Sequence, residues 1–432
     1  MADIPRLPDD NILGNPILPL ERWQREIKEI FSARVRERQF AFRHTWYLGA
    51  LTLGTFTIQL ITGILLMLYY HPSIPQAHAD IKDLQFVVSS GALLRNLHRW
   101  SAHAMVFLVF AHMAKVFFRG AYRPPRELNW NVGLELLQLT VLLSYTGYLL
   151  PWDQIAYWGT TVGSNILGSV PLVGDKLRMI LLGGNRVNAN FLLRFYALHT
   201  MVLPLGLILV IAIHIWRLHK DGGMHDAREA SSPGDASPTM SYGQLLLREG
   251  IAVQLLATVL ILIALRWNAP LEQLADPTHT PNPAKAPWYF TGLQELLHYF
   301  PPFVAGVVLP GLVMLGLMVV PYFNVNIKRE SLWARNKKRR LLAATGLVVA
   351  VAAALIGFKA WVPLAPVLVI GGLVLLAAQF SHRQGAGMRA WLGSRPLPFW
   401  IMTWFLMEAV TLTAVGTFFR GPGWSWVWPW KS

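Results

Sequence analysis

The chain contains no cysteine, which excludes disulfides, iron–sulfur clusters, thiolate catalysis and thioether-linked heme within it. It is also poor in charge: only 14% of its 432 residues are charged, and 23 acidic residues stand against 38 basic ones. A hydrophobic fraction of 54% beside so little charge is not the balance of a soluble protein. Composition therefore predicts a polytopic membrane protein.

Apolar stretches long enough to cross a bilayer recur along the chain. Residues 1–40 are instead polar, basic and interrupted by proline, so no cleavable signal segment is expected there. Residues 18–40 are predicted to form an amphipathic helix on the membrane surface, with a solvated arm as the alternative. We predict an all-α fold, a polytopic transmembrane helical bundle of about nine spans, at 46–70, 100–119, 132–151, 195–217, 250–266, 303–323, 341–358, 362–380 and 397–419.

The net charge of +15 does not indicate nucleic-acid binding, because the basic residues lie between the spans rather than on one folded face. Seven of them fall between residues 22 and 43, and seven more between 328 and 340. In a nine-span topology both groups lie on one side of the membrane, which the positive-inside rule makes cytoplasmic. We expect a bacterial-type inner membrane protein with a cytoplasmic N-terminus.

Two of the apolar stretches each carry two histidines at nearly the same spacing. His98 and His112 are 14 residues apart, and His199 and His214 are 15 apart. On an α-helix these separations advance about 21 and 22 Å and return to roughly the same face. Because the hydrocarbon core of a bilayer is about 30 Å thick, each helix would hold one histidine near each membrane surface, which suits two stacked hemes.

Topology decides how the histidines pair. The second and fourth spans run in the same direction, so His98 is predicted to ligate an outer heme with His199. An inner heme is then held by His112 and His214. Iron with two histidine ligands has no free axial position, which indicates electron transfer rather than oxygen binding. The two pairs predict a diheme four-helix core in the N-terminal half. His103 has no partner at this spacing and is predicted to face another helix or lipid headgroups.

Glycines in the neighbouring first and third spans repeat the 14-residue interval. Because glycine has no side chain, a flat macrocycle could approach the backbone at these positions. Contact between helices through small residues is the alternative. The glycines are Gly49, Gly63, Gly133 and Gly147. Cationic partners for the heme propionates are expected within a turn of the ligands, unless these side chains snorkel to the membrane surface. The candidates are Arg95, Arg99 and Lys115.

The chain divides at a segment of loop composition. We predict an N-terminal domain at 1–220, a linker at 221–248 and a C-terminal domain at 249–432. Two outer connections, 152–194 and 267–302, are too long to be turns. Long ordered loops of this kind usually carry function.

These residues resemble cytochrome b, the diheme subunit of quinol-oxidising bc and b6f complexes. The motifs are NLHRWSAHAMVFLVFAH at 96–112, RPPRELNWNVG at 123–133, TGYLLPWDQIAYW at 146–158 and RFYALHTMVLPLGLILVIAIH at 194–214. They look closest to the b6-type branch. ADPTHTPNPAKAPWYF at 275–290 and PYFNVNIK at 321–328 are similar to the separate small subunit of that branch, here in one polypeptide.

The resemblance implies two non-covalent b-type hemes, a quinone substrate, bound lipid, and a homodimeric complex with a Rieske iron–sulfur protein and a c-type cytochrome. Quinol would be oxidised at the outer face, with one electron passing through both hemes to an inner quinone site and protons translocated. For the outer quinone site the resemblance implies Trp158, Gly159, Val162, Pro287, Trp288 and the catalytic candidate Tyr289. For the inner site it implies His219 and Lys220, unless they are a snorkelling pair.

Three departures from the family pattern bear on function. Ala286 stands where the family motif Pro-Glu-Trp-Tyr has its proton-accepting glutamate, and Glu295 is the predicted catalytic substitute. Tyr47 replaces the cysteine that would hold a third, covalent heme in the b6 branch, so two hemes are expected. The span at 397–419 is additional. A diheme anchor serving a different periplasmic oxidoreductase is the alternative function, and a transporter with histidine proton relays is a third.

Overall fold

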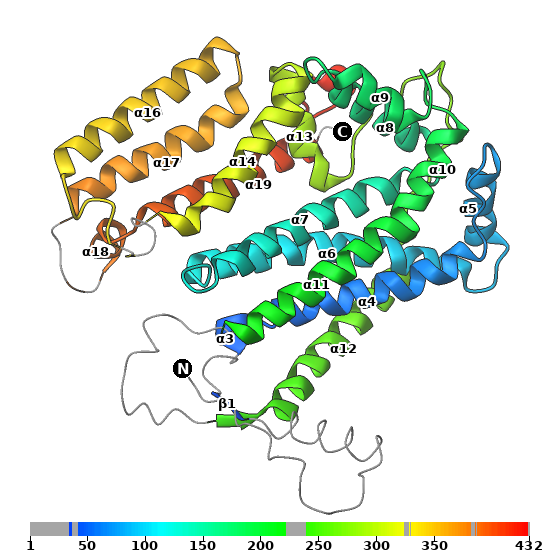
Figure 1. Ribbon diagram of the computed structural model, residues 1–432. Helices are drawn as coiled ribbons and strands as arrows, with labels where there is room; N and C mark the ends of the chain where they lie inside the picture. The colour runs from blue at the N-terminus through cyan, green and yellow to red at the C-terminus, as the bar shows by residue number, and fades with distance from the viewer. Residues whose placement is uncertain are drawn as a thin grey trace, which may run out of the picture.

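The computed structural model describes residues 34–36, 42–221, 239–323, 328, 330–381, 385 and 387–430, and they form an almost wholly helical bundle (Figure 1). Within these residues, eight helical segments are long and apolar enough to cross a membrane. The predicted all-α transmembrane bundle is therefore confirmed. The segments are α4 (Leu48–Met67), α6 (Gly91–Arg119), α10 to α11 (Ala189–Lys220), α12 (Tyr242–Arg266), η2 to η3 (Val304–Tyr322), α16 (Lys337–Gly357), α17 (Trp361–Gln379) and α19 (Leu397–Phe418).

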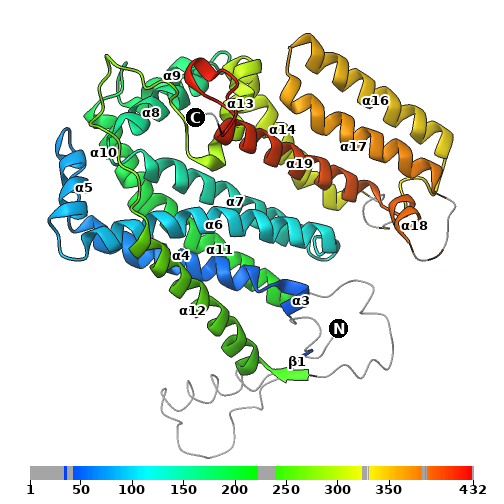
Figure 2. The same cartoon turned by 180° about the vertical axis from the view of Figure 1, so that it is seen from behind.

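The ninth predicted span, 132–151, corresponds to α7 (Glu127–Tyr148). Its 22 residues make a helix about 33 Å long, which is enough to cross a bilayer. Its first half carries Asn129, Asn131 and Glu135, and these polar side chains explain why it is less apolar than the other eight. It lies beside α6 and α11 (Leu203–Lys220) in the bundle (Figures 1 and 2).

The N-terminal half is a bundle of α4, α6, α7 and the α10–α11 segment (Figure 2). Leu134 of α7 and Leu207 of α11 are buried in one hydrophobic core together with Met105 of α6. Leu317 of α14 (Leu309–Val319) and Met402 of α19 belong to the same core. The C-terminal helices are therefore packed onto the four-helix bundle and share its interior.

A π-helix, η1 (Leu198–Val202), separates α10 (Ala189–Ala197) from α11. Pro204 follows it in the first turn of α11, where proline lacks an N–H and its ring disfavours an ordinary α-turn before it. A π-turn accommodates one residue more than an α-turn. The helix therefore turns by nearly the same angle over the 15 residues from His199 to His214 as it does over the 14 residues from His98 to His112 in α6.

The short helices gather at the two ends of the bundle (Figure 1). One end holds α5 (Gln76–Phe86), α8 (Gln154–Gly168), α9 (Gly174–Leu182), α13 (Trp288–Tyr299) and the 3-10 turn η4 (Pro422–Trp424). The opposite end holds α3 (Phe42–Thr45), α18 (Met388–Gly393) and a two-stranded sheet of β1 (Arg34–Arg36) and β2 (Thr239–Ser241). We call them the outer and inner ends, after the sides predicted from charge.

Two predicted boundaries change around this small sheet. The amphipathic helix expected at 18–40 lies outside the described residues, except for Arg34–Arg36, which form a strand antiparallel to β2. The linker expected to reach residue 248 ends earlier, because α12 begins at Tyr242. Ser241 caps this helix by accepting from the Gln244 backbone N–H, and the Gln244 side chain accepts from the Ser241 N–H. This reciprocal capping box fixes the start of α12.

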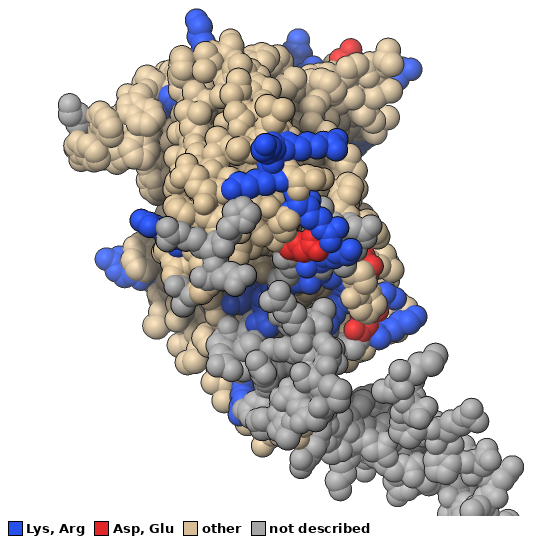
Figure 3. All heavy atoms as spheres, turned by 90° about the vertical axis from the view of Figure 1, so that its left-hand side faces the viewer, with Lys and Arg blue, Asp and Glu red and all other residues tan. Residues whose placement is uncertain are grey.

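Basic side chains are concentrated at the inner end. Figure 3 looks onto this end and shows many Lys and Arg side chains with few acidic ones. α6 ends here at Arg119, and α16 begins here with four consecutive basic residues, 337–340. Two basic segments far apart in the sequence therefore share one end of the bundle, as the predicted topology requires.

The additional span, α19, lies between α17 and α13 (Figures 1 and 2). Gly416 lets it approach α13 closely, because a Cβ at this position would stand 2.7 Å from the carbonyl oxygen of Thr291. The Thr291 hydroxyl lies 2.8 Å from that of Thr417. α19 therefore packs directly along the helix that begins with Trp288 and Tyr289.

Candidate functional site

The outer predicted ligands face each other across the bundle. His98 of α6 and His199 of η1 have ring centroids 6.3 Å apart, with ring planes at 78°. The Nδ1 of His98 lies 2.8 Å from the Thr62 hydroxyl, and the Nδ1 of His199 lies 3.1 Å from that of Thr146. The two rings are thus held from the neighbouring helices α4 and α7.

These threonines determine which ring nitrogen is free. The Thr62 hydroxyl donates to the Ile58 carbonyl at 2.6 Å, and the Thr146 hydroxyl donates to the Leu142 carbonyl at 3.0 Å. Because each hydroxyl proton is already used, the threonine oxygen accepts from the histidine Nδ1–H. Each Nε2 then keeps its lone pair, which is the state required to ligate iron. The residues of the outer pair fit a heme.

Each predicted glycine faces the histidine at its own depth. A Cβ built on Gly63 would lie 3.3 Å from Cε1 of His98, and one on Gly147 only 2.5 Å from Cε1 of His199. At the inner level the corresponding distances are 3.5 Å from Gly49 to His112 and 3.4 Å from Gly133 to His214. The matching 14-residue intervals therefore correspond to four glycine–histidine contacts between helices.

The predicted inner ligands, His112 and His214, lie further along the same helical segments, toward the inner end. His112 lies in α6 and His214 in α11, and each faces a glycine of the neighbouring helix. The Nδ1 of His214 is buried and faces the backbone of Asn129 rather than a hydroxyl group. No threonine precedes Gly49 or Gly133, so the sequence pattern that gives the outer pair its hydroxyl partners is not repeated at the inner level.

We expect Gly147→Ala to reduce outer-heme content, because its methyl group would overlap the His199 ring at 2.5 Å and no real Cβ contact is that short. Gly49→Ala is the matched control, since its Cβ would meet His112 at an ordinary 3.5 Å. Heme extraction and the reduced-minus-oxidised spectrum of the two purified variants measure the difference. Equal heme loss in both variants would contradict this account of the glycines.

The three predicted propionate partners have different environments. Arg95 already donates to the carbonyls of Ala269 and Pro270 and to the Gln85 side chain, so the structure gives it a role in holding the outer loop instead. The Lys115 ammonium lies 3.7 Å above the ring of Trp46. Arg99 remains the best candidate, because its buried Nε has no hydrogen-bond partner in the described residues.

The two long outer connections are joined to each other. Asp153 caps α8 by accepting from Ala156 N–H at 2.9 Å, and it also accepts from the Glu272 N–H at 3.2 Å. The backbone N–H of Gln154 donates to the Gln273 carbonyl, and that of Ala275 donates to the Trp152 carbonyl. Segments more than 100 residues apart therefore form one structured cap at the outer end.

The outer quinone candidates lie in this cap. Trp158 donates from its indole to the carbonyl of His279 at 3.2 Å, which links α8 to the second loop. Gly159 contacts α7 so closely that a Cβ would stand 2.3 Å from the Tyr148 hydroxyl. Val162 is exposed on α8. Pro287 precedes α13, and Tyr289 in its first turn packs against the Phe290 ring at 4.9 Å.

The inner quinone candidates lie at the exposed end of α11. His219 is held through its Nδ1, 2.8 Å from the Ile215 carbonyl. The Lys220 ammonium lies 4.9 Å from the centroid of the Trp216 ring. Both side chains are exposed, so they are accessible at the end of the bundle where an inner site is predicted.

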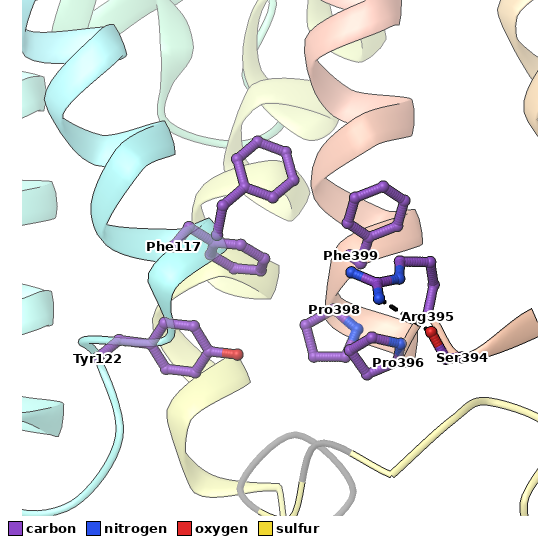
Figure 4. A pocket seen from close by; sticks show the side chains of 8 residues that line it. Phe117, Tyr122, Ser394, Arg395, Pro396, Pro398 and Phe399 are labelled. Carbon is purple, nitrogen blue, oxygen red and sulfur yellow. Dashed lines mark hydrogen bonds between the residues drawn. The ribbon is translucent and has the colours of Figure 1, made fainter. Parts of the chain in front are cut away.

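A separate cavity of about 320 Å³ opens at the inner end between α6 and α19 (Figure 4). Phe117 and Tyr122 come from the α6 side, and Arg395 and Phe399 face them from the start of α19. The Arg395 guanidinium stacks on Trp391 at 4.6 Å and donates to its carbonyl. None of the predicted heme or quinone residues lines this cavity.

Glu295, the predicted substitute base, is fully buried in a network of donors. Arg420 forms a two-pronged ion pair with it, Trp424 donates at 2.8 Å and Tyr299 at 2.8 Å. Burial raises the pKa of Glu295, but the hydrogen bonds from Arg420 and Tyr299 and the charge of Arg420 outweigh burial and hold the pKa below its ordinary value. A carboxylate held in this way is a poor proton acceptor. The geometry therefore gives Glu295 a structural role, as the ion-pair partner of Arg420, instead of the predicted role of catalytic base.

Sequence reasoning missed several residues that the structure places at the site. Thr62 and Thr146 could have been found, because each directly precedes an outer glycine. His103, set aside for want of a partner, accepts a hydrogen bond from Trp288 at 2.9 Å. Arg420 gave no signal, since 125 residues separate it from Glu295.

Comparison with known proteins gives evidence on the family of the chain. Two family profiles match in order: one described as cytochrome b/b6/petB at residues 38–222, and one described as cytochrome b(C-terminal)/b6/petD at 274–380. Cytochrome b6 of Heliobacterium mobile is 43% identical over 175 residues, which are 40% of this chain and 82% of the relative. Cytochrome b6 of Synechocystis sp. is 40% identical over 175 residues, 40% of this chain and 79% of the relative.

A solved structure titled hyperthermophilic respiratory Complex III has a similar fold, with a TM-score of 0.59 at 24% identity, covering 86% of this chain and 89% of that chain. The b6 relatives match 40% of the chain, while the first profile covers the helices before the linker and the second profile covers helices that follow it. The chain belongs to the cytochrome b/b6 family and joins, in one polypeptide, a b6-like N-terminal part and a C-terminal part like subunit IV.

Proposed function

We propose that this chain oxidises quinol at the outer end of the bundle and delivers electrons both to a Rieske iron–sulfur protein and toward an inner quinone site. The observation that carries the proposal is the contact between Trp288 and His103. His103 is five residues from His98 on α6, so the outer quinone candidates are attached to the helix that bears an outer heme ligand. A simple heme anchor does not require this connection.

The chain's own residues have distinct tasks in this function. His98 and His199 would hold the outer b-type heme, and His112 and His214 the inner one, with Arg99 as a propionate partner. Bound in this way, the hemes supply one-electron carriers at two depths of the membrane. The Thr62 and Thr146 hydroxyls keep the outer ligands in the tautomer that binds iron. The joined outer loops exclude water and position Trp158, Trp288 and Tyr289 around the quinol.

The domain division follows the same plan. We propose that residues 1–220 form the heme-binding domain and that the C-terminal domain supplies the second loop of the quinol site. The start of α12 at Tyr242 supports a domain boundary before residue 242. The basic inner end (Figure 3) supports a cytoplasmic location for that end, with α13 and the C-terminal tryptophans on the opposite side.

Purification of the intact complex from native membranes tests the function. We expect two non-covalent hemes per chain, a copurifying Rieske protein and c-type cytochrome, and quinol-dependent reduction of that cytochrome. A complex that retains both hemes but contains a periplasmic dehydrogenase or reductase in place of the Rieske protein would support the anchor function. Absence of a b-type heme spectrum would contradict both functions.

A further inference from the structure

His103 lies on the side of α6 that faces away from the heme ligands. Five residues separate it from His98, which turns its side chain by about 140° on the helix. Its ring packs among aromatic rings at the outer end: the centroid of Trp100 is 5.4 Å away, that of Tyr289 5.5 Å and that of Trp288 6.5 Å. His103 therefore belongs to the outer quinone candidates rather than to a heme.

The hydrogen bond from Trp288 fixes the tautomer of this histidine. An indole N–H can only donate, so the Nδ1 of His103, 2.9 Å from Trp288 Nε1, must be the accepting nitrogen. A neutral imidazole has one donor and one acceptor. The proton of the neutral ring is consequently on Nε2.

That Nε2–H group is buried without a partner. Within the described residues, no hydrogen-bond acceptor contacts Nε2 of His103. Buried donors without partners are rare in native proteins, and each calls for an explanation such as a ligand. The surrounding rings of Trp100 and Tyr289 add flat apolar surface on which an aromatic ligand can stack.

The chemistry of this environment matches a quinone. A quinone is a flat ring whose oxygens carry acceptor lone pairs, and a quinol oxygen keeps lone pairs that can still accept. A neutral N–H donor beside the cation Arg99, four residues earlier on α6, selects such an oxygen over a cationic ligand. Ala286, just before α13, offers no side-chain hydrogen bond, so the donor on α6 supplies a polar contact that this residue cannot make.

We propose that His103 binds the quinone substrate directly, by donating a hydrogen bond from Nε2 to one of its oxygens while Trp288 holds Nδ1. This inference rests on the proposed quinol oxidation at the outer end, and it names a substrate-binding residue for that site. In this contact the protein donates the hydrogen bond and the substrate oxygen accepts it.

The test compares two substitutions in the purified whole complex, using a short-chain benzoquinol or naphthoquinol, whichever the wild type oxidises. His103→Phe keeps the aromatic packing but removes both ring nitrogens, and we expect the KM for quinol to rise about tenfold, as the loss of one hydrogen bond implies. His103→Gln can accept from Trp288 with its oxygen and donate with its amide. It should stay within about threefold of wild type.

Infrared difference spectra of the complex with the oxidised quinone bound give a reading that does not depend on turnover. A hydrogen bond lowers the carbonyl stretching frequency of the quinone, so that frequency should rise in His103→Phe and remain near wild type in His103→Gln. Both heme spectra should be unchanged. His71→Gln is the matched control: this outer-end histidine pairs with Asp80 and should change neither KM nor the carbonyl band.

The inference is overturned if His103→Phe leaves both the KM and the carbonyl band unchanged. If His103→Phe loses its hemes, His103→Asn replaces it, because the shorter amide cannot reach both Trp288 and the substrate. A wild-type complex that binds quinone with the lowered band but oxidises no quinol would refute the proposed function and leave the His103 contact standing.

Discussion

His199→Leu is expected to remove the outer heme and to abolish quinol oxidation. Leucine offers no ligand, and His98, whose ring centroid is 6.3 Å from that of His199, would be left as a single ligand in an apolar site. Heme extraction should fall from two hemes per chain to one. Quinol oxidation should decrease by at least about 100-fold, since the outer electron carrier is lost.

His214→Leu is the matched comparison at the inner level. It should also leave one heme per chain, but the outer heme, held by the threonine-bonded pair, should remain reducible by quinol in a single turnover. The two single-heme variants must therefore differ in which spectral component disappears. If His199→Leu kept two hemes, the assignment of His98 and His199 to one heme would be wrong.

The arrangement of the four histidines in the N-terminal half follows from helix geometry. Residues 14 apart on an α-helix return to nearly the same face, so the spacing of His98 and His112 predicted two depths, and the glycine intervals predicted which helices face them. The contacts of Gly63 with His98 and of Gly133 with His214 agree with this. Periodicity within one helix was sufficient because each element is long, regular and apolar.

Contacts between distant segments left no such local signal. The Trp288–His103 hydrogen bond joins residues 185 positions apart, and no periodicity relates them. The π-turn at His199 changes the helix phase by one residue, which the spacing alone could not distinguish from an ordinary 15-residue separation. The partner of Glu295 was also invisible in the sequence, because it depends on how α19 packs against α13.

Arg420→Ala is expected to destabilise the outer end of the protein. Glu295 has no exposed surface and Arg420 only 9%, so removing the guanidinium leaves a carboxylate buried without its counter-ion. Breaking a buried pair in this way typically costs about 3–5 kcal/mol. The temperature at which the purified complex loses quinol oxidation should fall. The heme spectra at low temperature should remain those of the wild type, because α4, α6, α7 and α11 are not involved.

The same pair explains what the additional span contributes. Arg420 and Trp424 follow α19, and both donate to Glu295 of α13, while Lys285 donates to the Thr417 carbonyl at 2.9 Å. These contacts hold the helix that starts with Trp288 and Tyr289. We therefore expect Arg420→Ala to raise the KM for quinol as well as to lower thermal stability.

A double-mutant cycle separates this structural role from proton transfer by Glu295. Glu295→Leu and Arg420→Met should each impair quinol oxidation under either role. In Glu295→Leu/Arg420→Met both charges are replaced by apolar groups of similar size, a change that is often neutral or stabilising for a buried pair. If Glu295 only anchors α19, the double variant should recover thermal stability and most of the quinol oxidation lost in Arg420→Met, with strong coupling between the two positions. If Glu295 is the proton acceptor, the double variant must remain inactive however stable it becomes, and the structural assignment fails.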